Sequence, residues 1–157
     1  MDPQEPDLVI LVAGAYTAVT DRLQRELESR RIDGMRPSYG FVIRAVHAER
    51  PTVNRLAELL EVTKQSASKL ADDMIRAGFL TRVPDEEDRR RVRLELTDRG
   101  AAVRRSALRT SEKLEDELAA AAGPRAVPAL RRALLALIEA EGGLEAVAAR
   151  RPRPPQG

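Results

Sequence analysis

Side chains able to hydrogen-bond with an extended polar partner gather in two stretches of this 157-residue chain. The first stretch holds Thr63, Lys64, Gln65, Ser66, Ser68 and Lys69. The second places four arginines within the five residues 89–93. Gln can bond an adenine edge twice, Lys reaches guanine acceptors, and Ser serves bases or phosphates. Arginine at the end of a narrow loop suits a DNA minor groove, where the potential is most negative. Together the two stretches predict contacts with a DNA duplex.

The first stretch would need a helix to present it. Thr52 is a suitable N-cap for a short helix over 53–60, and Thr63 for a longer one over 64–77 that Gly78 ends. The longer segment places apolar residues at i, i+3, i+4 and i+7, which is one buried stripe. These residues are Ala67, Leu70, Ala71 and Met74. The spacing predicts a helix-turn-helix whose second helix turns its polar first turns outward.

The second stretch would need a hairpin. Residues 91–97 alternate polar and apolar, which predicts a strand with one buried face, and 79–83 can pair with it. Residues 84–90 then form the loop, and Gly100 is expected to end the ribbon. We expect Arg90 to enter the minor groove while Arg89 and Arg91 contact flanking phosphates.

Two carboxylates near these cations are expected to pair with them. Asp88 should bind a neighbouring arginine and hold the shape of the loop. Asp72 and Arg76 should pair with each other at i, i+4 on the longer helix. The acidic run 85–88 is interpreted as charge balance for the arginines rather than as a metal site.

Longer helices flank this central region. Apolar periodicity predicts helices over about 7–31, 37–49 and 101–121, and another from Pro124 to Gly142. The fold class is therefore mainly α with a small β-hairpin. The apolar surfaces 8–12 and 134–138 are more than one short chain would cover, which favours a homodimer over a monomer that uses them as its own core.

Composition excludes several classes of protein. The net charge is only +2 and residues 53–100 balance ten Lys/Arg against ten Asp/Glu, so DNA binding must depend on placement rather than bulk charge. With no cysteine and one histidine, thiol chemistry, metal sites and a histidine-based triad are not expected. Catalytic motifs are missing as well, so we expect no enzyme and no cofactor. The first apolar run is too short for a membrane span and lacks a positive leader, which predicts a soluble cytoplasmic protein.

The central stretch resembles the winged-helix core of MarR-type (multiple antibiotic resistance regulator) transcription factors. The resemblance rests on LAELLEVTKQSASKLADDMIRAGFLTRV at 56–83, followed by DEEDRRRVRLELTDRG at 85–100. Its most specific part is the Asp-Arg-Arg run and the alternating strand that ends Leu-Thr-x-x-Gly. The order of the predicted helices agrees along nearly the whole chain.

This resemblance implies one domain over 1–157, with a winged helix-turn-helix at 36–100 and dimerisation helices at 7–35 and 101–149. The composition of 150–157, rich in Arg and Pro, predicts a disordered tail. It implies a homodimer that reads a palindromic operator in double-stranded DNA. It also implies release by a small ligand, aromatic or otherwise lipophilic, held between the two lobes. By position, Arg90 matches the family's minor-groove arginine, and 64–69 match its major-groove helix.

The chain departs from the family pattern at two positions. Glu61 stands at a turn where glycine is common, so either a left-handed conformation there costs about 1–2 kcal/mol or the turn differs slightly from that of the family. Arg36 stands where a capping Thr is frequent. At the start of this helix, Arg36 and Ser38 are the candidates for contacts with the DNA backbone. The absent cysteines exclude the peroxide-sensing branch, and the single histidine argues against the zinc-sensing branch.

Other interpretations stay open at this point. A winged-helix module that binds a protein partner and no DNA would explain the neutral charge of 53–100. Repression and activation are not separated by the sequence, although repression is the expectation. His47 is interpreted as a structural or surface histidine, and Tyr16, Tyr39 and Phe41 as core residues.

Overall fold

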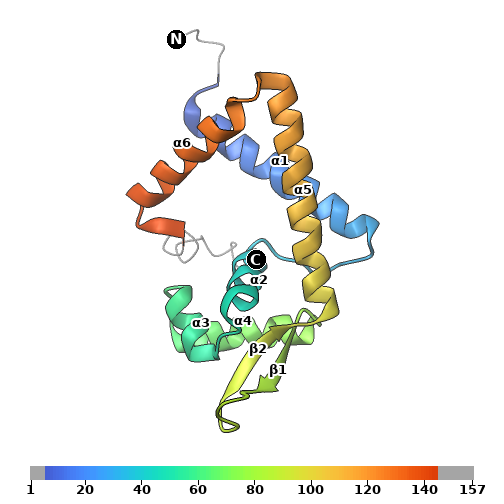
Figure 1. Cartoon of the computed structure of the whole chain (residues 1–157), viewed down its shortest axis with the longest axis vertical. Coiled ribbons are helices and arrows are strands. Elements are labelled where there is room, and N and C mark those ends of the chain that lie inside the picture. The colour runs from blue at the N-terminus through green and yellow to red at the C-terminus, as the bar shows by residue number, and fades with distance from the viewer. Residues whose placement is uncertain (1–5, 145–157) are drawn as a thin grey trace, which may run out of the picture.

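The computed structural model describes residues 6–144, which form helices and one two-stranded antiparallel hairpin (Figure 1). The elements are α1 (Leu8–Ser29), α2 (Tyr39–Glu49), α3 (Val53–Leu59), α4 (Lys64–Arg76), β1 (Leu80–Pro84), β2 (Val92–Leu96), α5 (Asp98–Ala122) and α6 (Ala126–Ala140). The predicted fold class, mainly α with a hairpin wing, is confirmed. The predictions for 145–149 and for the tail at 150–157 lie outside the described residues.

Helix starts follow local capping signals. The Thr52 hydroxyl accepts a hydrogen bond from the Arg55 N–H at 3.2 Å, and the Thr63 hydroxyl accepts one from the Ser66 N–H at 3.1 Å. Each satisfies a backbone donor that has no partner inside the helix. Gly78 follows α4 with φ of +76°, the left-handed C′ conformation that glycine adopts without strain. These predicted caps are confirmed.

The lower lobe, which we define as residues 36–103, contains most of the hydrophobic core. Buried residues from α2, α3, α4, both strands and the second turn of α5 meet there. Tyr39 and Phe79 pack edge to face with ring centroids 6.0 Å apart, and Leu56, Met74 and Leu94 are fully buried around them. Tyr39 is therefore a core residue, as predicted. This packing fixes α4 and the hairpin relative to each other.

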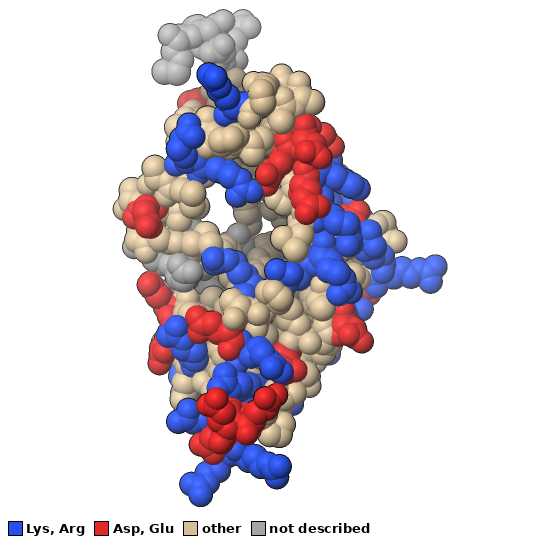
Figure 2. Space-filling model, viewed as in Figure 1, with Lys and Arg blue, Asp and Glu red and all other residues tan. Residues whose placement is uncertain are grey.

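The upper lobe, which we define as α1, α6 and the part of α5 beyond residue 103, is packed differently. Leu27 is the buried residue of α1, and α6 has none among its described residues. Leu8 is 74% exposed and Leu135 is 63% exposed. Tyr16, expected in the core, is half exposed on this surface. Figure 2 shows an opening between α6 and α5 above the lower lobe.

Gly100 does not end the ribbon; this prediction is wrong. Helix α5 begins at Asp98, with the Thr97 hydroxyl accepting the Gly100 N–H at 3.1 Å, so Gly100 lies in the first turn. A Cβ atom at Gly100 would lie 2.2 Å from the Phe79 carbonyl oxygen. Glycine is needed here because the helix passes directly against the backbone where β1 starts.

Two further sequence features are placed by the structure. Glu61 has φ of +51°, so the turn between α3 and α4 is left-handed at a non-glycine residue, which is the first of the two alternatives expected there. Helix α2 begins at Tyr39 rather than at Pro37, which lies in a preceding turn. In the part of the chain that the structure describes, no helix is long and apolar enough to cross a membrane.

Candidate nucleic-acid interface

Helix α4 presents the predicted polar residues on its exposed side. Ala67, Ala71 and Met74 are buried against the lower lobe. The opposite side is solvent-exposed at Thr63, Lys64, Gln65, Ser66 and Lys69, and half-buried at Ser68. The structure therefore brings all six candidates together over the first two turns of one helix, where a recognition helix meets base edges.

The Thr63 hydroxyl organises the start of this surface. It accepts the Ser66 N–H and also donates to the Ser66 hydroxyl oxygen at 2.9 Å. Ser66 is thereby held at the helix start, while Lys64, Gln65 and Lys69 remain free of intramolecular hydrogen bonds among those the structure describes. Long side chains without such bonds are available to an incoming partner.

The expected pair between Asp72 and Arg76 does not form; this prediction is wrong. Asp72 accepts a hydrogen bond from Arg82 of β1 at 2.8 Å, and Arg76 pairs with Asp73 instead. Arg82 reaches Asp72 because the hairpin packs beside α4, a proximity that helical spacing alone does not reveal. The Asp72–Arg82 ion pair thus joins α4 to β1.

The hairpin forms the wing in a defined register. Arg82 lies opposite Leu94, and Val83 opposite Arg93, with the loop 85–91 between the strands. Arg89, Arg90 and Arg91 are all exposed on this loop. Figure 2 shows basic side chains at the tip of the wing, with carboxylates just above them. Arginines that project beyond the fold in this way can reach into a groove.

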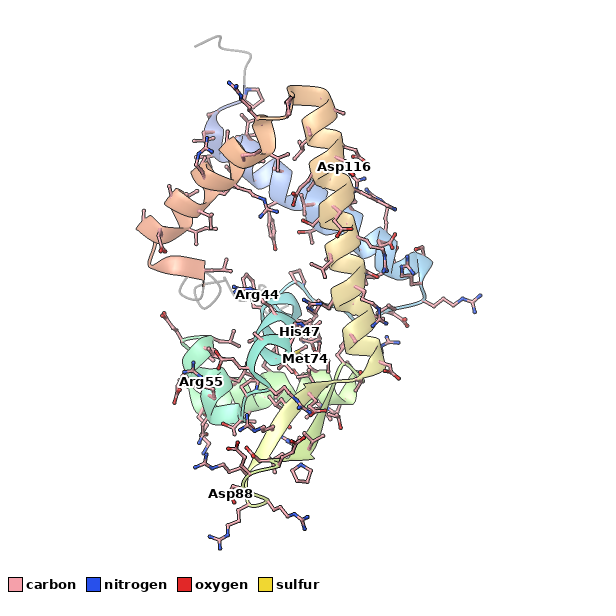
Figure 3. The ribbon with its side chains drawn as sticks, in the orientation of Figure 1. Arg44, His47, Arg55, Met74, Asp88 and Asp116 are labelled. Atoms are coloured by element: carbon pink, nitrogen blue, oxygen red, sulfur yellow. The ribbon has the colours of Figure 1, made fainter. Side chains whose placement is uncertain are left out.

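Asp88 shapes the tip, as predicted. Its carboxylate accepts the Arg90 N–H at 3.0 Å and lies 3.5 Å from the Arg91 Nε. The Asp88 carbonyl oxygen also accepts the Arg91 N–H at 2.8 Å. Figure 3 places Asp88 at the far end of the wing. The loop is therefore closed by its own carboxylate, and the arginine side chains are left outside it.

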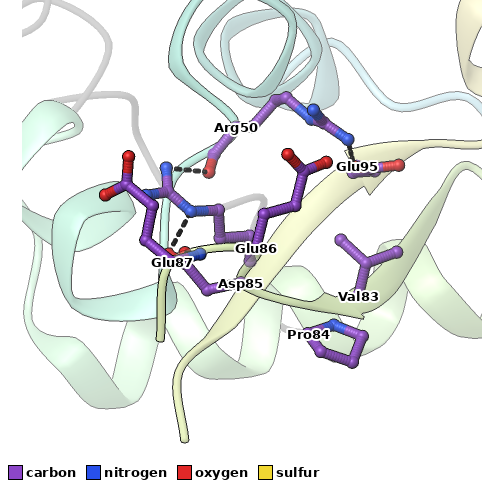
Figure 4. Close-up of a pocket in the computed structure, with 8 residues that line it drawn as sticks. Arg50, Val83, Pro84, Asp85, Glu86, Glu87 and Glu95 are labelled. Atoms are coloured by element: carbon purple, nitrogen blue, oxygen red, sulfur yellow. Dashed lines mark hydrogen bonds and ion pairs between the residues drawn. The ribbon is translucent and has the colours of Figure 1, made fainter. Parts of the chain in front are cut away.

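Asp85 anchors the base of the loop, a role that sequence reasoning missed. Its side chain is buried, accepts the Glu87 N–H at 2.8 Å and the Asp88 N–H at 3.3 Å, and pairs with Arg93 (Figure 4). The Glu87 N–H and the Arg93 guanidinium hold the pKa of Asp85 below its usual range. The carboxylate is thus charged at neutral pH and binds both ends of the loop.

Arg93 and its neighbours tie the wing to the α2–α3 turn. Arg93 Nη1 lies 3.5 Å from the Arg50 carbonyl oxygen, and the Leu94 N–H donates to the Pro51 carbonyl at 2.9 Å. Arg50, which has φ of +48°, pairs with Glu95 (Figure 4). The sequence signal for this network was an aspartate at the start of a hairpin loop and an arginine just beyond its end.

Arg36 and Ser38 lie apart from the wing. Both are exposed in the linker between α1 and α2, and the Ser38 side chain makes no capping hydrogen bond. The Arg36 guanidinium carbon stands 5.7 Å from the Tyr39 ring centroid. Arg36 shares a surface depression with Asp73 and Arg76, toward the C-terminal end of α4. Arg36 thus lies beside the C-terminal end of α4, and Ser38 follows it in the linker.

A small cavity of about 140 Å³ lies between α1 and this linker. Its walls are mostly apolar, and its lining includes the polar side chains of Tyr16, Thr20, Gln24 and Arg36. The linker itself is fixed by Arg99 at the start of α5, whose Nη2 donates to the Asp33 carbonyl at 2.7 Å. The same guanidinium lies 5.1 Å from the Phe79 ring centroid. The cavity therefore adjoins a segment that is bonded to the lower lobe.

The described residues do not form a metal-binding site. No group of three or more His, Asp or Glu side chains is placed to hold a metal ion there. His47 is exposed in the last turn of α2 (Figure 3). The chemical groups that gather on one side of the molecule are donors and cations from α4 and the wing.

Comparisons with known proteins agree with this geometry. Residues 33–91 match the model of the MarR family, so the predicted resemblance to these transcriptional regulators is confirmed. A search of curated protein sequences finds no match.

Solved structures of MarR-type regulators share the fold. The S. aureus MepR–DNA complex is 19% identical, with a TM-score of 0.65 over 85% of this chain and 96% of that one. MarR is 24% identical, with a TM-score of 0.62 over 90% and 95%. S. aureus MepR bound to ethidium bromide is 17% identical, with a TM-score of 0.62 over 86% and 96%.

Proposed function

We propose, from the premise that residues 33–91 match the MarR family, that this chain is a sequence-specific regulator of transcription that binds double-stranded DNA. The observation that carries the proposal is the joint placement of two surfaces. Six polar residues occupy the exposed start of α4, and three exposed arginines occupy the tip of a wing that Asp85 and Asp88 hold in shape. A recognition helix and a wing would read neighbouring grooves.

The regulator acts as a homodimer on a palindromic operator. Support comes from the upper lobe, where α1 and α6 leave large apolar side chains uncovered. Monomeric soluble proteins rarely expose contiguous apolar surface of this kind. A symmetric dimer would present two recognition helices and two wings, with half-sites about one helical turn apart on one face of the DNA.

The regulator is a repressor that a small molecule releases. The cavity between α1 and the linker suits an aromatic or otherwise lipophilic ligand with an acidic group, because its walls are apolar and Arg36 is a cation at its edge. Among proteins of the same fold, S. aureus MepR has a structure bound to ethidium bromide, which is an aromatic compound. A ligand that prefers one separation of the recognition helices would change operator affinity by its differential affinity for the two dimer shapes.

A protein-interaction module without DNA binding is the second candidate. The observation in its favour is the neutral balance of ten Lys/Arg and ten Asp/Glu over 53–100. Such a module would use the same exposed surfaces for a protein partner. Direct titration with DNA separates the two candidates.

The deciding experiment selects bound fragments from the source genome and titrates the enriched duplex by fluorescence anisotropy. We expect binding that weakens as salt rises. Arg90→Ala should weaken it at least several-fold and leave the dimer intact, whereas Gln65→Ala should relax base preference more than it lowers binding to mixed-sequence DNA. A wild-type chain that binds no duplex at low salt would overturn the proposal in favour of the interaction module.

A further inference from the structure

The two faces of the wing carry opposite charge. Successive residues of a strand point to opposite faces, so Val83, Arg93 and Glu95 share one face and Arg82, Val92 and Leu94 the other. On the first face, a depression of about 440 Å³ is lined by four carboxylates, Asp85, Glu86, Glu87 and Glu95, and by Arg50 and Arg93. Both of those arginines are ion-paired there. This face has more negative than positive groups.

The second face is basic. A depression of about 510 Å³ lies between this face and the start of α3. Its lining includes Arg82, Arg90 and Arg91 together with the side chain of Asn54. None of the described residues that line it is acidic. The net charge of residues 53–100 is zero, but acidic and basic side chains lie on opposite faces of the hairpin.

The position of the basic depression relates it to the DNA backbone. Arg82 pairs with Asp72 of α4, so the depression adjoins the recognition helix on one side, while Arg90 and Arg91 connect it to the wing. A duplex that receives α4 in its major groove and the wing in the adjacent minor groove places the phosphate strand that separates those grooves between the two elements. That strand would run over this depression.

Resting on the function proposed above, we propose that Arg82, Arg91 and Asn54 form a phosphate-binding site that clamps the strand between the two grooves. Arg82 uses one terminal nitrogen on Asp72, and its side chain is 45% exposed, which leaves further donors for a phosphate oxygen. Asn54 is exposed and supplies amide donors. Arg91 is held near Asp88 at the edge of the loop, with its side chain 69% exposed.

The phosphate-binding site would raise the affinity for DNA of any sequence and would not change the preference for particular bases. Contacts to phosphates position a protein on the duplex without reading bases. Each neutralised phosphate contributes about 0.9 to the slope of log affinity against log salt. The segregated faces also imply one orientation, with the basic face toward the DNA and the carboxylate face away from it.

The test compares Arg82→Gln with Arg30→Gln as a matched control. Arg30 is also ion-paired and its side chain is 46% exposed, but it lies at the end of α1. We expect Arg82→Gln to weaken binding about 3- to 10-fold and to reduce the salt slope by about one. The loss should be equal on the selected operator and on a mixed-sequence duplex of similar length. Arg30→Gln should leave the slope unchanged.

A further variant separates phosphate contact from a purely structural role. Asp72→Asn breaks the Asp72–Arg82 ion pair but keeps the arginine, so it should bind as tightly as the wild type or more tightly. If Asp72→Asn weakens binding as much as Arg82→Gln does, or if Arg82→Gln leaves the salt slope unchanged, the phosphate site is overturned. A wild type that binds neither duplex would overturn the proposed function as well, so the two failures are distinguishable.

Discussion

The lower and upper lobes contain comparable amounts of apolar sequence but bury very different shares of it. In the lower lobe, Val42, Leu56 and Phe79 are fully buried and share one core. In the upper lobe, α1 buries Leu27 alone and the described residues of α6 bury nothing. A folded chain gains stability roughly in proportion to the apolar area it removes from water. The lower lobe therefore has a core of its own within one chain, whereas the upper lobe leaves apolar surface that the proposed dimer would cover.

The largest effect is expected from a charge placed on the exposed surface of α6. Leu135→Arg should convert the dimer into a monomer, because an arginine would be buried without a partner at the proposed interface. Operator affinity should then fall by about 100-fold or more, since the two half-sites are no longer linked. Light scattering after size-exclusion chromatography and anisotropy titration measure the two effects.

Ser111→Arg is the control for the added charge, because Ser111 is an exposed polar residue of α5. It should leave the oligomeric state unchanged. A wild-type chain that elutes and scatters as a monomer would remove the premise that the upper lobe is completed by a second copy.

The completeness of the lower lobe can be tested at Gly100. Gly100→Ala should destabilise the chain by about 1–3 kcal/mol, because the added Cβ would collide with the Phe79 carbonyl oxygen and overpacking forces a backbone shift. Gly40→Ala is the matched control. It too lies in a first helical turn, but nothing lies within 4 Å of its added Cβ, so it should stabilise α2 by up to about 1 kcal/mol. Urea unfolding followed by circular dichroism measures both; equal effects would contradict the tight packing at Gly100.

A smaller effect is expected at the wing anchor. Asp85→Asn removes the charge that binds Arg93, so the loop should lose its fixed shape and operator affinity should fall about 10-fold. In an Arg90→Ala background the same change should add little, because the anchor acts through the position of that arginine. Anisotropy titration of the double-mutant cycle measures this coupling; additive losses would show that Asp85 supports the fold in general rather than the wing.

The Glu86→Gln variant and the pH dependence of binding both test the role of the Asp85 charge. Glu86→Gln removes a charge from the same loop, but Glu86 is exposed, so it should leave affinity unchanged or raise it slightly. Because the pKa of Asp85 is held below its usual range, its contribution should be fully present above the ordinary carboxyl pKa. It should be lost only as the pH falls through the lowered value, so the gap between wild type and Asp85→Asn should stay constant from neutral to mildly acidic pH.

Local signals in the sequence predicted the helix-turn-helix well. A cap such as Thr63 and a terminating Gly78 act within one turn of the helix that they start or end, so their effect is visible from neighbouring residues. The polar surface of α4 followed in the same way, because the positions of Ala67 and Ala71 determine which side is buried.

Contacts between different helices and strands could not be predicted from these local signals. Asp72 has Arg76 four residues away, yet it pairs with Arg82 because the hairpin folds back beside α4. Gly100 fits the pattern of a terminator in the sequence, but glycine is required there because α5 passes close to the Phe79 carbonyl. Each of these features depends on how two elements approach in space, and periodicity within one element carries no information about that distance.

Thr97, the N-cap of α5, fixes the N-terminal end of this long helix to the lower lobe. Its hydroxyl donates to the Gly78 carbonyl at 2.6 Å and its N–H to the Phe79 carbonyl at 3.1 Å, so the foot of α5 is bonded to the end of the recognition helix and the start of the wing. The 25 residues of α5 make a rod about 37 Å long. Tilting such a rod by about 5° about its foot would move its far end by about 3 Å. In the proposed dimer, a shift of that size between the upper lobes would therefore move α4 and the wing together.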